Sequence, residues 1–196
     1  LASEKFFCLK KNFKELKSND LVVANLEGPI TDNKSVSINT IPESPNNYFF
    51  TFDPSLAATL YDKNIKIVNL GNNHILNFGR QGLASTKNYL DNANVDYFGP
   101  PDYPKSISAE IKKIKITFIN YNEFADLPQD INEKSTIEEI QKAKEYSDII
   151  IVYSHWGNEY IKTPSELQVN LAHQFIDAGA DLIIGSHPHV TGQVEE

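Results

Sequence analysis

Six side chains of types that bind divalent metal ions or transfer protons follow the short apolar segments of this sequence. They are Glu27, Asn73, His74, His155, His187 and His189. Such segments are typical of strands in α/β proteins, whose ligands bind beyond the carboxyl ends of the strands. Imidazole nitrogens with one carboxylate and one carboxamide oxygen suit Zn, Mn, Fe or Ni better than Mg or Ca. We therefore expect all of these residues except His74 to surround one metal-binding pocket at an edge of a sheet.

Each candidate has a structural alternative when it is taken alone. A histidine at a strand end often hydrogen-bonds to a neighbouring loop. Glu27 could cap a helix or form a salt bridge, and Asn73 could occupy a turn. His173 lies inside a helical segment and is expected on a helix surface. The metal interpretation therefore depends on the combination of residues and not on any one of them.

Two of the histidines lie close together, in the sequence Gly185-Ser-His-Pro-His-Val190. In an extended segment, His187 and His189 would project from the same face because they are two residues apart. Pro188 is expected to restrict His187 to an extended conformation. The pair could then contact two sides of one metal cluster.

Hydrophobic periodicity predicts an α/β domain with a mixed, largely parallel sheet. Strands are expected at 21–26, 65–70, 95–98, 148–153 and 181–184, with an antiparallel hairpin between 106 and 121. Helices are expected at 5–18, 55–63, 80–92, 137–146 and 164–178. Thr163, Pro164 and Glu166 predict the start of the last helix through an N-cap and a capping box. The segment 31–54, rich in Asn, Ser, Pro and Thr, is expected to be a long loop that covers a site.

Composition limits the class of protein. The 196 residues, 40% hydrophobic and 22% charged, fit one globular domain or two small ones that share a core. Because no linker divides the sequence, a single domain over residues 1–196 is expected. The formal net charge of -8, without a cluster of basic residues, argues against a nucleic-acid partner. The longest apolar runs, such as 149–153, are far shorter than the roughly 20 residues that span a bilayer. The single cysteine, Cys8, cannot form an internal disulfide.

Four ordered motifs cover the chain from about Asn19 to Gln193. They are Asn25-Leu-Glu-Gly-Pro-Ile-Thr31, Gly71-Asn-Asn-His74 with Gly79, His155-Trp-Gly-Asn-Glu-Tyr160, and Asp177-Ala-Gly-Ala-Asp-Leu-Ile-Ile-Gly-Ser-His-Pro-His189. In order and spacing they resemble the bacterial capsule-synthesis and poly-γ-glutamate-biosynthesis proteins of CapA/PgsA type. Those proteins are similar to calcineurin-like metallophosphoesterases. The resemblance implies a metallophosphatase-like β-sandwich flanked by helices, with mixed sheets.

The resemblance also implies roles for the individual residues. Glu27 would bridge two divalent metal ions, which would be Mn, Zn or Fe. Asn73, His155 and His187 would hold one ion, and His189 would help to hold the other. His74 would be the catalytic group that stabilises or protonates the leaving oxygen. A bridging hydroxide would attack phosphorus in line, while both metal ions neutralise the developing charge.

Two functions follow as alternatives. The chain could be a metal-dependent hydrolase acting on a phosphoester or on a bond in a capsule or poly-γ-glutamate precursor. It could instead be a non-catalytic scaffold or polymer-binding member of a capsule synthesis and export complex. In either case the resemblance implies the capsule or poly-γ-glutamate synthesis machinery as partner, and an extracytoplasmic or membrane-associated parent protein.

The family pattern extends beyond both ends of this sequence. Members usually begin with a strand ending in Gly-Asp, and no such strand precedes Leu21. They also continue after the position of Gln193 with a further strand. We therefore expect a fragment truncated at both ends that lacks the aspartate of the first metal site.

Overall fold

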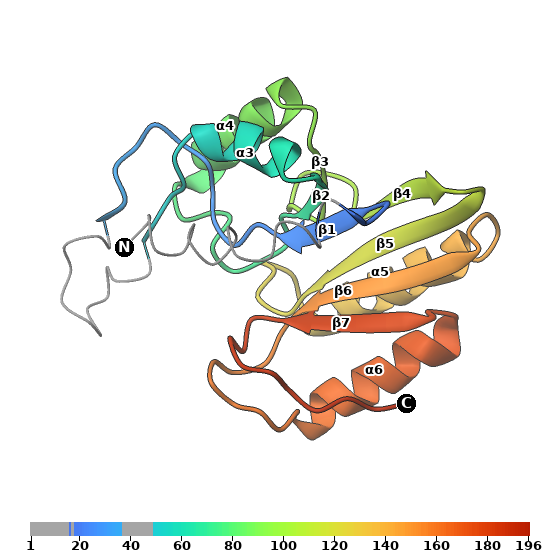
Figure 1. The fold of residues 1–196 in the computed structure, drawn as a ribbon. Coiled ribbons are helices and arrows are strands. Elements are labelled where there is room, and N and C mark those ends of the chain that lie inside the picture. Colours follow the sequence, from blue (N-terminus) through green and yellow to red (C-terminus); the bar gives the residue numbers. More distant parts are fainter. Residues whose placement is uncertain (1–15, 17, 37–48) are drawn as a thin grey trace. The chain divides into compact units, whose positions relative to one another are not determined.

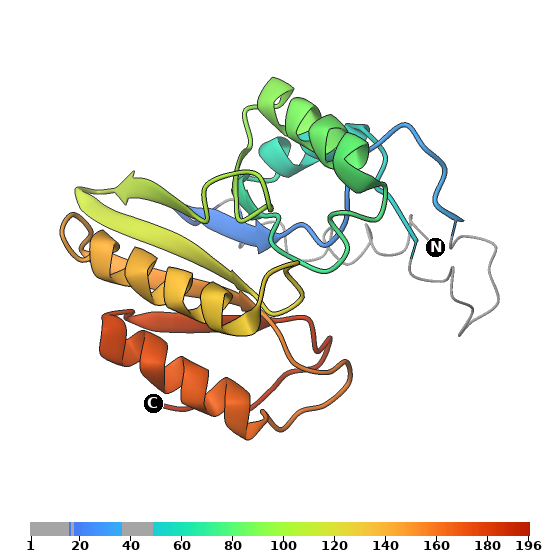
Figure 2. The ribbon, with the colours of Figure 1, turned by 180° about the vertical axis from the view of Figure 1, so that it is seen from behind.

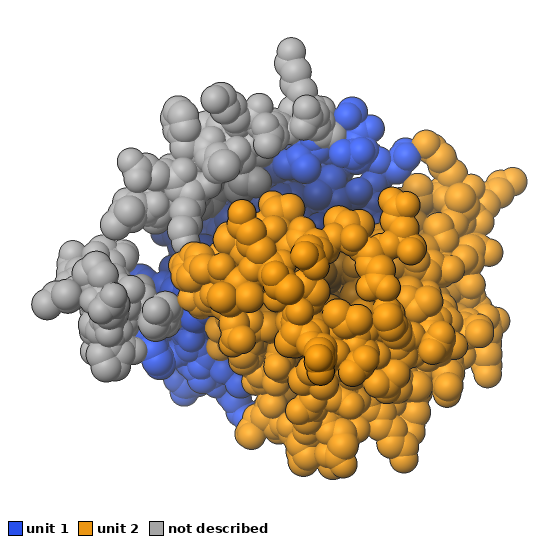
Figure 3. Space-filling view, turned by 90° about the horizontal axis from the view of Figure 1, so that it is seen from below, with its two compact units in different colours: residues 1–70, 74–97 blue, residues 71–73, 98–196 orange. Residues whose placement is uncertain are grey.

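A computed structural model describes residues 16, 18–36 and 49–196. The helix predicted at 5–18 lies almost entirely outside these residues, as does the 37–48 part of the predicted loop. The chain divides into two compact units, which Figure 3 colours separately. Unit 1 consists of residues 1–70 and 74–97, and unit 2 of residues 71–73 and 98–196. That residues 1–196 act as a single domain stays a prediction.

Unit 1 is built on a three-stranded sheet with the strand order β1-β2-β3. The strands β1 (Val22–Asn25) and β2 (Ile65–Asn69) pair in parallel, and β3 (Asp96–Phe98) follows at the edge. Two helices, α3 (Ser55–Asp62) and α4 (Gly79–Asn92), complete the unit. Both helices bury one face, as helical spacing of their apolar residues predicts. The predicted strands and helices of this region are confirmed to within a residue or two.

Unit 2 is built on a four-stranded mixed sheet with the order β4-β5-β6-β7. The strands β4 (Ser106–Ile111) and β5 (Ile114–Asn122) form an antiparallel hairpin, as predicted. Lys112 and Lys113 make its turn with φ values of 52° and 71°, which suits a two-residue hairpin loop. Both β6 (Ile149–His155) and β7 (Leu182–Ser186) continue the sheet in parallel. The predicted α/β class with mixed sheets is confirmed.

Two helices cover one face of this sheet, as the reverse view in Figure 2 shows. α5 (Gln129–Ala143) packs against β5, α6 (Glu166–Ala178) packs against β7, and the two helices contact each other. Tyr121 and Phe175 are fully buried between sheet and helices, with ring centroids 5.3 Å apart. Loops, and not the helices, follow the carboxyl ends of these strands, as Figure 1 shows. No helix in the described part of the chain is long and apolar enough to cross a bilayer.

Both helices begin at residues other than those predicted from the sequence. α5 starts at Gln129 and not at residue 137, because its first turns bury Asn132 and Thr136 in place of the apolar residues that reveal a helix. The N-cap of α6 is Ser165 and not Thr163. Ser165 accepts a hydrogen bond from the backbone of Gln168, and the Gln168 side chain accepts one from the backbone of Ser165. The capping box therefore uses glutamine where Glu166 was expected.

Lys105 explains why polar residues are buried at the start of α5. Its Nζ donates hydrogen bonds to Oδ1 of Asn132 at 3.0 Å and to the hydroxyl of Thr136 at 2.9 Å. Burial lowers the pKa of Lys105 to about 8, and the negative charge of Glu139 opposes this shift. Asn132 in turn donates from Nδ2 to the carbonyl oxygen of Asn122 at 2.9 Å. This network fixes the carboxyl end of β5.

The segment 71–73 belongs to unit 2 because Asn120 holds it there. Asn120 is 3% exposed, and its Nδ2 donates to the carbonyl oxygen of Gly71 at 3.1 Å. A Cβ added at Gly71 would lie 2.2 Å from Oδ1 of Asn120, far inside van der Waals contact. Glycine is therefore required at position 71 for the chain to approach β5 this closely.

We predict that Gly71→Ala lowers the free energy of unfolding by about 1–3 kcal/mol, the usual cost of overpacking a close contact. Denaturant unfolding followed by circular dichroism measures this change. Gly192→Ala is the matched control, because its added Cβ would lie 3.6 Å from the carbonyl oxygen of Lys162, an ordinary contact. Equal stability of the two variants would show that Asn120 does not confine Gly71.

Candidate metal centre

The carboxyl ends of three parallel strands meet at one edge of the sheet in unit 2. The register sets Asn122 of β5 beside His155 of β6, and His155 beside Ser186 of β7. His187 and His189 follow directly after β7. Parallel pairing therefore brings residues more than 60 positions apart in sequence to one edge, as strand-end placement predicts.

Four of the predicted metal ligands lie together at this edge. Nε2 of His155 is 2.9 Å from Oδ1 of Asn73. The ring centroids of His155 and His187 are 4.9 Å apart, and those of His187 and His189 are 6.0 Å apart. His155 is fully buried, His187 is 7% exposed, and His189 faces solvent. We call Asn73, His155, His187 and His189 the histidine cluster.

The other two candidate site residues, Glu27 and His74, belong to unit 1. Oε2 of Glu27 accepts a hydrogen bond from Nδ2 of Asn25 at 3.0 Å. His74 is 8% exposed, and its Nδ1 lies 3.3 Å from Nδ2 of Asn77. Its ring packs against Phe50, with centroids 4.7 Å apart. The roles of Glu27 and His74 at a metal centre stay predictions that rest on the family resemblance.

The backbone after β7 differs from the extended segment that Pro188 was expected to impose. The φ value of His187 is 95° and that of His189 is 56°, both in the left-handed region. A following proline disfavours the right-handed helical conformation but does not itself exclude positive φ. The chain bends immediately after β7, and the His187 ring packs on Phe124 with centroids 4.5 Å apart. Sparsely populated backbone conformations of this kind cluster at functional sites.

The loop that follows β5 supports the cluster, and sequence analysis missed it. The backbone nitrogen of Glu123 donates to the carbonyl oxygen of His155 at 3.0 Å, and its carboxylate accepts from the backbone nitrogen of Gly157 at 2.7 Å. Phe124 also contacts the His155 ring edge-on, at 5.9 Å between centroids. The signal was available, since Asn122, Glu123 and Phe124 also follow a predicted strand. None of the three was predicted to belong to the site, although Asn122 and Glu123 are of the same residue types as the predicted ligands Asn73 and Glu27.

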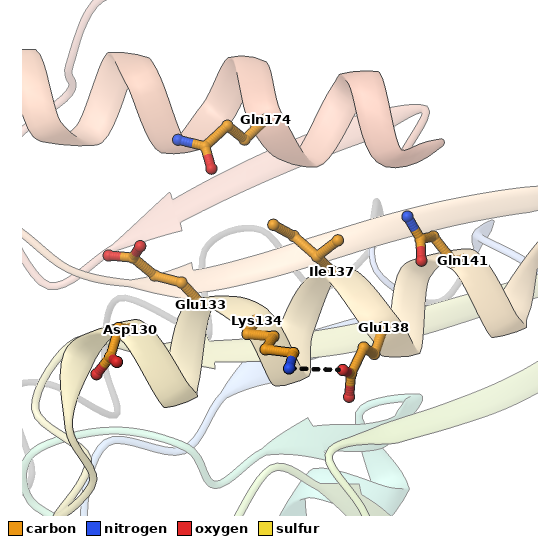
Figure 4. Close-up of a pocket in the computed structure, with 7 residues that line it drawn as sticks. All are labelled: Asp130, Glu133, Lys134, Ile137, Glu138, Gln141 and Gln174. Atoms are coloured by element: carbon orange, nitrogen blue, oxygen red, sulfur yellow. Dashed lines mark ion pairs between the residues drawn. The ribbon is translucent and has the colours of Figure 1, made fainter.

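His173 lies outside the cluster, on the exposed surface of α6, as expected. Its Nε2 contacts Oε1 of Glu195 at 2.8 Å. A hollow of about 390 Å³ between α5 and α6 is also separate from the cluster. Figure 4 shows the residues that line it, which include no histidine and no predicted metal ligand. Lys134 and Glu138, 3.9 Å apart on its rim, form an exposed ion pair of the kind that contributes little stability.

The histidine cluster fits a divalent metal ion in donor type and in spacing. Zinc binds imidazole nitrogen and side-chain oxygen at about 2.0–2.2 Å, so two ligands of one ion lie at most about 4.4 Å apart. The 2.9 Å between Nε2 of His155 and Oδ1 of Asn73 satisfies this limit. The burial of His155 and His187 removes water that would compete for the same nitrogen atoms. Asn73 and His155 are therefore close enough to bind one ion together.

The sequence and the fold were compared with known proteins. A family model described as "Bacterial capsule synthesis protein PGA_cap" matches residues 6–196. The PGA biosynthesis protein CapA of Bacillus subtilis is 31% identical, over 91% of this chain and 50% of that protein. The capsule biosynthesis protein CapA of Bacillus anthracis is 27% identical, over 89% of this chain and 46% of that protein. The chain thus spans about half the length of these curated relatives.

Solved structures show a similar fold. A structure described as a novel phosphatase from Mycoplasma pneumoniae aligns with a TM-score of 0.59 at 22% identity, over 94% of this chain and 59% of that chain. A hypothetical protein from Thermus thermophilus aligns with a TM-score of 0.53 at 18% identity, over 93% of this chain and 60% of that chain. These likenesses confirm that the chain shares the α/β fold of the two solved structures. Because the family model covers nearly all of its residues, the chain belongs to the bacterial capsule synthesis protein family PGA_cap.

Proposed function

We propose that this chain carries a dinuclear-metal, phosphoesterase-like hydrolase site of a capsule or poly-γ-glutamate biosynthesis protein. The observation that supports this most is the convergence of Asn73, His155, His187 and His189 at one sheet edge of unit 2. The likeness in fold to a structure described as a novel phosphatase, and the names of the relatives, agree with it. The substrate would be a phosphoester or a bond in a polymer precursor.

In this proposal, Asn73, His155 and His187 would hold one divalent ion and His189 would contribute to a second. Glu27 would supply the carboxylate of the site, a role that rests on the family resemblance. The bound ions, Mn, Zn or Fe, would supply Lewis-acid charge and lower the pKa of a bound water. Burial of His155 and His187 keeps their rings in fixed positions, which reduces reorganisation during the reaction.

His74 is the proposed catalytic residue. It would stabilise or protonate the leaving oxygen, a task for which histidine is suited near neutral pH. Its contacts with Asn77 and Phe50 hold the ring in one orientation within unit 1. A general acid of this kind contributes about 10²- to 10⁴-fold in rate.

The wider biological setting is also part of the proposal. The partner would be the capsule or poly-γ-glutamate synthesis machinery, and the parent protein would be extracytoplasmic or membrane-associated. The formal net charge of -8 disfavours direct electrostatic capture of an anionic polymer. Chemistry on a precursor therefore agrees better with the charge than polymer binding does.

We predict that His187→Ala and His189→Ala lower the amount of bound Zn or Mn without unfolding the chain. These residues lie after the strand, so they contribute more to the site than to the core. Elemental analysis after dialysis measures the metal, and circular dichroism measures the fold. His173→Ala is the matched control, because that histidine is exposed on α6. Loss of folding in metal-free His187→Ala or His189→Ala would show that the pair is structural.

We also predict that the chain hydrolyses a generic aryl phosphate slowly, and only when Mn or Zn is present. His155→Ala should lower the rate at least about 100-fold, because loss of a ligand should exceed the 10- to 100-fold cost of losing an outer hydrogen-bond partner. Initial rates with metal and with a chelator test this. Stoichiometric metal without hydrolysis would favour the non-catalytic scaffold. Hydrolysis that persists in chelator would contradict the metal-dependent site.

A further inference from the structure

An exposed tyrosine lies beside the histidine cluster, in the loop that follows β6. Tyr160 ends the motif His155-Trp-Gly-Asn-Glu-Tyr160 and is 70% exposed, the largest fraction among the aromatic residues that the structure describes. Its ring centroid lies 6.2 Å from that of His189, and the two ring planes are tilted by 37°. Aromatic pairs interact at centroid distances of about 4.5–7 Å. Tyr160 is therefore a neighbour of the cluster, although most of its surface faces solvent.

Neither the backbone nor the core explains a tyrosine at this position. The φ value of Tyr160 is 62°, in the left-handed region where glycine and asparagine are favoured and a bulky side chain is uncommon. A ring that is 70% exposed also adds little to core packing. Residues in such sparsely populated conformations cluster at active sites and ligand-binding sites. The position of the Tyr160 ring therefore suits a ligand better than it suits the fold.

Hydrogen bonds hold the loop that carries Tyr160. Its backbone nitrogen donates to the carbonyl oxygen of Pro188, between the two histidines, at 2.7 Å. Nearer to β6, the backbone nitrogen of Trp156 donates to the carbonyl oxygen of Ser186 at 3.2 Å. Figure 1 shows that the loops after β6 and β7 leave the sheet at the same end. The Tyr160 ring is thus presented in a fixed place, which lowers the entropy lost when a ligand binds.

Two aromatic side chains flank the cluster, and they differ in what they contact. The Phe124 ring packs on both His155 and His187, so it helps to hold the buried part of the cluster. Tyr160 lies beside His189, the exposed histidine, and is followed by Ile161, which is also exposed. A group bound at His189 from solvent therefore meets an aromatic and apolar surface next to the proposed metal ligands.

We propose that Tyr160 is a specificity-determining residue that stacks on a ring carried by the substrate beside its phosphate. This inference rests on the proposed function, because it takes the histidine cluster as the place where the phosphate binds. The substrate class is then a phosphoester whose organic group contains a ring, either aromatic or saturated as in a sugar. A tyrosine supplies a large, rigid contact surface at a low cost in conformational entropy, because only two side-chain torsions are fixed.

Phosphonates test this preference without catalysis, because their phosphorus–carbon bond replaces the ester bond. Calorimetric titration in the presence of Zn²⁺ compares phenylphosphonate and cyclohexylphosphonate with methylphosphonate. We expect at least one ring to bind about 2- to 10-fold more tightly than methyl, the range that one aromatic contact supplies. This ratio should fall to about one in Tyr160→Ala and persist in Tyr160→Phe. Comparison of the two rings distinguishes an aromatic substrate from a sugar.

Two further variants make the result decisive. Tyr160→Gly should behave like Tyr160→Ala, and it accepts a φ of 62° without strain, so it replaces the alanine variant if that one misfolds. Tyr146→Ala is the matched control and should keep the ring preference. Tyr146 is also exposed, but it packs on Lys115 near the start of β5, at the opposite end of that strand from the cluster.

The outcomes separate this inference from the proposed function. Equal binding of ring and methyl phosphonates by the unmodified chain, or a ring preference that survives in Tyr160→Ala and Tyr160→Gly, would overturn the role of Tyr160. Zn²⁺-dependent hydrolysis of phenyl phosphate would still support the proposed function in that case. A ring preference that depends on Tyr160, without any such hydrolysis, would support the binding role while the hydrolase assignment fails.

Discussion

The parallel pairing of β6 with β7 is the constraint on which the histidine cluster depends. It places His155 beside Ser186 at the carboxyl edge of the sheet and starts the turn that carries His187 and His189. The register is set by burial, since Ile150, Val152 and Ser154 alternate with residues on the other face of β6. A sheet of this kind specifies its register because a slip exchanges its two faces. Packing in the core of unit 2 therefore determines where the side chains of the histidine cluster lie.

Glycine and aromatic residues allow the segments that carry the histidine cluster to pack closely together. Gly71 lets the chain approach Asn120 closely enough to place Asn73 against His155. Gly185 serves a related purpose, since an added Cβ would lie 3.0 Å from Nε1 of Trp156. Phe124 packs on the His187 ring from the loop after β5. Polar ligand atoms are thus held by small and apolar residues that are not ligands themselves.

Much of the fold could be predicted from the sequence because apolar periodicity and strand-end placement are local signals. Examples are the hairpin around Lys112 and Lys113, the strand that ends at His155, and the strand that ends just before His187. The start of α5 could not be predicted, because it buries Asn132 and Thr136 against Lys105, a contact between segments distant in sequence. The extended conformation expected for His187 was also wrong, because Pro188 disfavours the right-handed helical region without excluding the positive φ that His187 adopts.

For the site, sequence reasoning identified residue types but not their supports. Asn73, His155, His187 and His189 were expected in one pocket with Glu27, and the structure brings these four together in unit 2. Ser186 and Phe124 were overlooked because hydroxyl and phenyl groups are not ligands of the expected kind. Their contacts with His155 and His187 join segments distant in sequence, which spacing along a sequence does not encode.

The central claim is that His155 and Asn73 bind one divalent cation together. Anomalous X-ray diffraction at the zinc edge, from crystals of the chain grown with Zn²⁺, tests it most directly. The account predicts an anomalous peak about 2.0–2.2 Å from both Nε2 of His155 and Oδ1 of Asn73. A fully ordered site without such a peak, with Nε2 and Oδ1 still 2.9 Å apart, would contradict it.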